Sequence, residues 1–210
     1  METLFSMLGL YQLSALMLPG AVAVSGAYYA VRGLPADPST AAVLGLIVLF
    51  YVAGNVIQGT AVLWEGTYWK KSGGWPSIRR MSSGDPKAYD AALRALIESK
   101  LEAFFGADNS SLPTGERFAL ARAELRRQGQ DTRSESFNSI YGLSRGLDSA
   151  GVLVVAVSLV CVIVGHAAHR NWIMAVIVGA AAVPVFVRFV RFSFYFADQV
   201  WRDFAALPTS

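Results

Sequence analysis

The chain has 210 residues, of which 54% are hydrophobic and 16% are charged, and its formal net charge at pH 7 is +3. Soluble domains carry about 25% charged residues, so the composition argues against a wholly soluble protein. Nucleic-acid binding needs a dense basic surface, which so small a net charge does not supply, and we expect no nucleic-acid partner.

Four apolar stretches reach the roughly 20 residues that a helix needs to cross a bilayer. They run from about residue 10 to 31, 41 to 64, 150 to 168, and 172 to 196. The leader before the first stretch, residues 1–8, contains no Lys or Arg, so we interpret this stretch as a retained helix rather than a signal peptide. The predicted fold class is therefore all-α: a four-helix multi-pass membrane protein.

Basic residues near the ends of these stretches predict their orientation. Only Arg32 and Arg170 flank the short outer connections, which are residues 33–40 and 169–171. The other side has nine basic residues: Lys70, Lys71, Arg79, Arg80, Arg133, Arg145, Arg188, Arg191 and Arg202. We therefore expect both termini and the long loop to be cytoplasmic, in a protein of the cell inner membrane.

The long loop between the second and third spans is predicted to be helical. Asp85 suits an N-cap, and apolar residues at helical spacing follow from Pro86 to Phe105. The apolar face of this helix is expected to be buried, and it consists of Leu93, Leu96, Ile97, Leu101 and Phe104. A second helix is predicted from Gly115 to about Arg127.

A third helix of the loop is predicted to begin near Ser134 and to continue into the third span. The resulting organisation is a first transmembrane hairpin at 1–69, a cytoplasmic helical region at 70–149, and a second hairpin at 150–210 with a cytoplasmic C-terminal extension.

The second span contains four polar residues at helical spacings, Tyr51, Asn55, Gln58 and Glu65. Polar groups inside hydrocarbon are costly and often functional. One interpretation is a wet path through a pore, and the other is hydrogen bonding between helices, worth under about 1 kcal/mol per contact. Under either interpretation we expect this face to be turned away from lipid.

Basic residues at the inner end of the last helix are a second candidate group. Arg188, Arg191 and Arg202 either extend to lipid headgroups, form a basic ring at the inner mouth of an oligomeric pore, or bind carboxylates of the loop.

Two segments at the cytoplasmic edge are candidates for binding a ligand headgroup or a partner protein. One is a turn-forming segment that includes Gly73, Gly74, Trp75, Pro76, Arg79 and Arg80. The other is a helical face with Asn138, Tyr141 and Arg145. Both lie at the same predicted edge, so they are candidates to meet in the fold; the alternative is a turn plus interfacial anchoring.

Motifs for catalysis are absent from the sequence, including the nucleophile elbow, the zinc-protease helix and the phosphate loop. His166 and His169 have no carboxylate close in sequence. We therefore expect no enzyme activity, no catalytic residues, no cofactor and no metal.

The leading functional hypothesis is an oligomeric channel, pore or membrane-perturbing effector, gated through the cytoplasmic helices. Small residues that favour close helix packing predict a homo-oligomer. The alternative is a non-conducting anchor or adaptor whose cytoplasmic helices bind a partner protein; a lipid-modifying enzyme is a third reading. The layout is similar to that of small multi-pass effectors that bacteria use in anti-phage defence, which implies a role in bacterial defence.

The orientation predicts which reagents reach the loop. In a Cys161→Ser background, a cysteine at Ser110 should resist an impermeant thiol reagent in intact cells and react after the membrane is opened. Ready labelling in intact cells would mean that the loop faces outwards.

Overall fold

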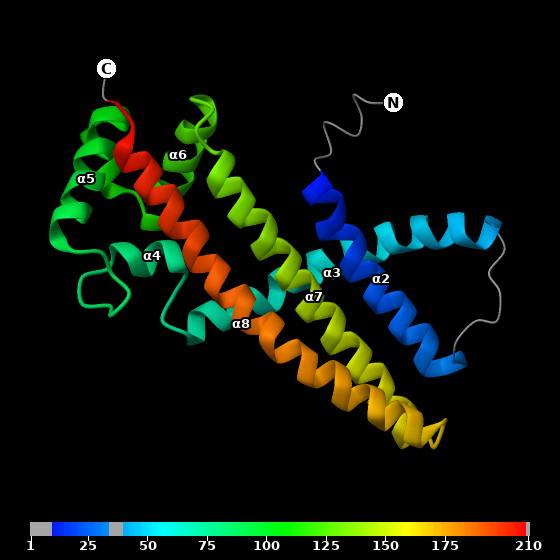
Figure 1. Ribbon diagram of the computed structural model, residues 1–210. Coiled ribbons are helices and arrows are strands. Elements are labelled where there is room, and N and C mark those ends of the chain that lie inside the picture. The colour runs from blue at the N-terminus through cyan, green and yellow to red at the C-terminus, as the bar shows by residue number, and fades with distance from the viewer. Residues whose placement is uncertain (1–9, 34–39, 209–210) are drawn as a thin grey trace. The chain divides into compact units, whose positions relative to one another are not determined.

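The computed structural model describes residues 10–33 and 40–208, so the leader at 1–8 and most of the first outer connection lie outside the described residues. Every secondary-structure element among the described residues is a helix, which confirms the all-α prediction (Figure 1). The elements are α2 (Leu10–Arg32), α3 (Thr40–Lys71), α4 (Pro76–Met81), α5 (Ala91–Phe105), the 3-10 helix η1 (Ala107–Ser111), α6 (Thr114–Arg127), α7 (Thr132–Ile163) and α8 (Ala168–Ala206).

Three helical stretches of the described chain are long and apolar enough to cross a membrane: Gly45–Met81, Thr132–Ile163 and Ala168–Ala206. The first contains most of α3 and continues through α4. The predicted first span does form a helix, α2, but it is not one of these three.

The first helix of the long loop begins later than predicted, at Ala91 instead of Pro86. Asp90 caps it, because its Oδ1 accepts a hydrogen bond from the backbone N–H of Leu93 at 2.7 Å. Asp85 is occupied elsewhere, since its carboxylate accepts from the side chain of Arg79. The other predicted loop helices are present, and α7 runs without a break from Thr132 into the third apolar stretch, as expected.

The chain divides into two compact units. Unit 1 comprises residues 1–65 and 139–190, and unit 2 comprises residues 66–138 and 191–210. The division falls within continuous helices, so α3, α7 and α8 each contribute residues to both units.

In unit 1, α2 and α3 cross with their backbones nearly in contact. A Cβ placed on Gly20 would lie 1.8 Å from the carbonyl oxygen of Phe50, and one on Gly54 would lie 1.9 Å from that of Leu16. Both glycines are therefore required for this crossing, because no larger residue fits between the backbones. Beside it, Ala23 of α2 packs against α3 and α7 in a small buried cluster.

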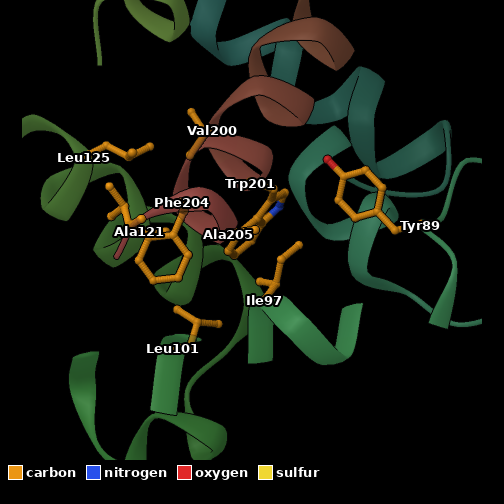
Figure 2. Close-up of a cluster of buried hydrophobic side chains, with 10 residues drawn as sticks. Tyr89, Ile97, Leu101, Ala121, Leu125, Val200, Trp201, Phe204 and Ala205 are labelled. Carbon is orange, nitrogen blue, oxygen red and sulfur yellow. The ribbon is translucent and has the colours of Figure 1, made fainter. Parts of the chain in front are cut away.

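Unit 2 has its own hydrophobic core, formed where α5, α6 and the C-terminal part of α8 pack together (Figure 2). Its largest buried side chains are Ile97, Leu101, Leu125, Trp201 and Phe204. This core confirms the burial expected for Ile97 and Leu101. Leu96 lies on the flank of α5 and is 44% exposed within the chain, so its expected burial is not found there.

The two leucines of α5 make a matched pair of probes. Leu101→Ala should destabilise the protein by about 2–5 kcal/mol because Leu101 is completely buried. Leu96→Ala should change stability by less than about 0.5 kcal/mol. Thermal unfolding of the detergent-purified protein, followed by circular dichroism, measures both. Equal losses would contradict the core in Figure 2.

Candidate functional site

The strongest polar feature of unit 1 is an ion pair between two of its apolar helices. Arg145 of α7 donates through Nη1 to Oε2 of Glu65 of α3 at 2.7 Å. The Glu65 side chain is 1% exposed. Two opposite charges in this position compensate each other, whereas either one alone would lie between apolar helices without an opposite charge.

Gln58 extends this pair into a network that joins three helices. Its Oε1 accepts from Nε and Nη2 of Arg145 at 3.3 and 3.1 Å. Its Nε2 donates to the backbone carbonyls of Ala15 in α2, at 3.0 Å, and of Gly142 in α7, at 2.9 Å. Both ends of the amide are thereby satisfied, as the low dielectric of an apolar environment requires.

Aromatic side chains surround the Gln58–Glu65–Arg145 network. The guanidinium carbon of Arg145 lies 5.6 Å from the ring centroid of Tyr141. The Tyr141 ring stacks in turn on Phe189 of α8, with 5.3 Å between the ring centroids. Trp64 contacts the same phenylalanine at 5.3 Å and donates from Nε1 to Oγ of Ser149 at 2.9 Å. Helices α3, α7 and α8 therefore meet around the charged pair.

The polar stripe predicted for the second span is divided by this packing. Gln58 and Glu65 face the interior of unit 1, whereas Tyr51 and Asn55 are exposed within the single chain. The amide of Asn55 donates to the carbonyl of Tyr51 on its own helix at 2.8 Å. The expectation that the whole face turns inwards fails at these two residues, because α2 packs on the side of α3 that carries Phe50 and Gly54 and leaves Tyr51 and Asn55 exposed.

The basic residues at the end of the last helix are exposed. Arg191 donates to the hydroxyl of Tyr195 at 2.7 Å, and Arg202 pairs with Asp198 one turn earlier at 2.9 Å. Arg188 is exposed in unit 1.

In unit 2, the segment from Gly73 to Arg80 forms a tight turn followed by α4. Gly73 and Gly74 have φ angles of 94° and 110°, which residues with a side chain rarely adopt. Pro76 is buried at the start of α4, and Trp75 is 39% exposed.

The arginines after this turn are engaged within unit 2. Arg79 pairs with Asp85 at 2.7 Å, and this hydrogen bond holds the pKa of the Asp85 carboxyl below its usual range. Arg80 pairs with Asp198 at 3.5 Å and lies over the ring of Tyr89 at 5.3 Å. Burial raises the pKa of the Tyr89 hydroxyl well above its usual range. These contacts favour a structural role for the turn.

The second candidate group, Asn138, Tyr141 and Arg145, has contacts in both units. Asn138 hydrogen-bonds Glu135 at 3.3 Å in unit 2, while Tyr141 and Arg145 belong to the network in unit 1. Sequence reasoning placed Glu65 and Arg145 in separate groups. The signal that would have joined them is their opposite charges at the same predicted end of two apolar spans.

Two further polar features of unit 1 were missed. Asp148 of α7 is buried. In the sequence, a single carboxylate next to an apolar run was the feature that could have pointed to it. At the opposite end of α7, Asn171 and Arg170 of α8 both donate to the carbonyl of Ala30, at 3.1 and 2.9 Å. These bonds satisfy a carbonyl at the C-terminal end of α2.

The fold and the Gln58–Glu65–Arg145 network together define an all-helical protein. It has three helices that are long and apolar enough to cross a membrane, and a charged pair joins two of them. No protein-family model, curated protein or solved structure matches the chain.

The charged pair predicts a characteristic mutational pattern. Glu65→Leu should cost up to about 3–5 kcal/mol of stability, because it leaves the guanidinium of Arg145, whose side chain is only 19% exposed, without an opposite charge. The double variant Glu65→Leu/Arg145→Met should lose less than the sum of the two single losses. Unfolding of the purified variants in detergent gives the coupling energy. Strictly additive losses would show that the two residues do not stabilise each other.

Proposed function

We propose that this protein is an oligomeric membrane channel or pore, or a membrane-perturbing effector, in which α3 faces the other copies. The observation that supports this most directly is an exposed polar side chain, Asn55, within the apolar part of α3. An amide in a bilayer gains stability when another helix supplies its missing hydrogen-bond partners. A second copy of α3 supplies the same amide.

The residues around Asn55 suit close approach of another helix. Exposed residues recur at the spacing of a helix–helix seam: Gly45, Val48, Val52, Asn55, Gly59 and Val62. A Cβ placed on Gly45 or Gly59 would meet nothing within 4 Å, so the backbone is accessible there. Small residues in such a seam let membrane helices pack closely.

In the proposed assembly, copies of α3 surround a path to which Tyr51 and Asn55 contribute polar groups. Gating through the cytoplasmic helices is proposed because α3, α7 and α8 each continue from unit 1 into unit 2. A ligand or protein bound to unit 2 would thus act on three helices at once. The proposal includes α2 as a fourth span, both termini in the cytoplasm of a bacterial inner membrane, and a role in defence, and it assigns no catalytic step.

A second candidate function is a non-conducting anchor whose cytoplasmic helices bind a partner protein. The separate core of unit 2, built on Trp201 and Phe204, favours it, because a module with its own core is suited to binding. Ion leakage from proteoliposomes supports the first function. Co-purification of one soluble protein without leakage supports the second.

Substitution of Asn55 tests the pore proposal. Asn55→Leu should weaken oligomers, as measured by cross-linking, and change ion flux in liposomes, while leaving the folded chain intact because Asn55 bonds only its own helix among the described residues. Val56→Leu, at another exposed position, is the matched control and should change neither property.

Gln58→Leu should behave differently, because Gln58 joins three helices within one chain. It should lower thermal stability before any effect on assembly. If the wild-type protein passes no ions and Asn55→Leu leaves the oligomer unchanged, the pore proposal is wrong.

A further inference from the structure

An open groove lies in unit 1 where α2 ends and α8 begins. Tyr29 of α2 forms one wall, and one face of α8 forms the other, with His169, Arg170, Ile173, Met174 and Ile177. The groove has a volume of about 390 Å³. Sites for small molecules have volumes of roughly 300–1,000 Å³, so this groove is large enough to hold part of a ligand.

The polarity of the groove changes along α8. His169 and Arg170 lie at one end, and the apolar wall continues from there to Ile177, over about 10 Å at the rise of an α-helix. Trp172 is exposed beside the cationic end, and exposed tryptophans of membrane helices lie at the level of the lipid headgroups. The cationic end therefore lies at the headgroup level, and the apolar wall extends towards the hydrocarbon.

The charge of Arg170 is not neutralised by a carboxylate among the described residues. Its Nη2 donates to the carbonyl of Ala30 at 2.9 Å, and its guanidinium carbon lies 5.2 Å from the ring centroid of Tyr29. Its Nε has no hydrogen-bond partner in this part of the chain. Helix α2 contains no Asp or Glu, and neither occurs between residues 149 and 197. The groove is thus a cationic site without its own anion.

A phospholipid has the matching order of groups, with an anionic phosphate next to apolar chains. Arginine is well suited to phosphate, because its planar guanidinium donates several charge-assisted hydrogen bonds. A free phosphate ion would leave the apolar wall uncovered, and an uncharged apolar ligand would leave Arg170 without an anion. The helices that form the groove also offer no carboxylate for the ammonium group of an ethanolamine headgroup, which favours an anionic lipid.

We infer that this groove is a binding site for one anionic phospholipid. The phosphate accepts hydrogen bonds from Arg170 and His169, and one acyl chain lies along Ile173 and Ile177. Since Arg170 also bonds the end of α2, the bound lipid stabilises the contact between α2 and α8. The inference is independent of the proposed pore, because the groove does not include α3.

Lipid binding to the full chain, purified in detergent and stripped of lipid, tests the inference. Native mass spectrometry should show one retained phosphatidylglycerol per chain, and less phosphatidylethanolamine at the same concentration. Diacylglycerol with the same chains, which has no phosphate, should not be retained, and excess inorganic phosphate should not displace the lipid. Phosphatidylglycerol should also raise the thermal midpoint. Equal retention of diacylglycerol, or displacement by inorganic phosphate alone, would overturn the assignment.

Two variants locate the site. Ile177→Trp fills the groove and should abolish retention of phosphatidylglycerol, while Val183→Trp on the same helix lies outside the groove and should not. The two positions are a matched pair, because they are 62% and 63% exposed and neither supports the fold. Equal retention by these two variants would exclude the groove as the site.

Arg170→Gln tests the contact with the phosphate. It should weaken binding of phosphatidylglycerol roughly tenfold, as the loss of a charge-assisted hydrogen bond predicts. The carbonyl of Ala30 keeps a donor in this variant, because Asn171 also bonds it at 3.1 Å. If Arg170→Gln binds phosphatidylglycerol as tightly as the wild type, the phosphate contact is wrong.

Discussion

The pairing of Arg145 with Glu65 constrains the packing of unit 1 more than any other contact. Each charge would be costly alone between apolar helices, so α3 and α7 must meet in the register that brings them together. Gln58 fixes the position of α2 as well, because its side-chain amide donates to one backbone carbonyl of α2 and to one of α7. A displacement of α3 by one turn would leave a buried charge and a buried amide without partners.

In lipid, no hydrophobic force drives helices together, and this explains the kind of contacts found in the rest of unit 1. Such helices associate through close packing and hydrogen bonds. Gly20 and Gly54 provide the close packing where α2 crosses α3, and Gln58 provides the hydrogen bonds beside that crossing. Asn55 lies one residue after the crossing and has no hydrogen-bond partner from another described helix. Its exposed amide is therefore the basis for proposing contacts between copies of the chain.

Unit 2 is stabilised in a different way, by a core of the kind found in water-soluble proteins. Trp201 and Phe204 of α8 pack against α5 and α6. Ion pairs in the same unit include Arg117–Glu98 and Arg80–Asp198. Arg79 and Arg80, which looked available for a ligand, are occupied by Asp85 and Asp198. The turn that begins at Gly73 therefore positions α4 through contacts within unit 2.

The sequence by itself determined the helical class, the apolar stretches and the continuous run of α7, because length and helical periodicity are local properties. It left the start of α5 open, since Asp85 and Asp90 are both good N-caps and only the position of Arg79 decided between them. Spacing placed Asn55, Gln58 and Glu65 on one face of α3. Only the tertiary structure decided which of them acquired neighbours, because the pairing of Glu65 with Arg145 joins residues 80 positions apart, and helix packing sets such contacts.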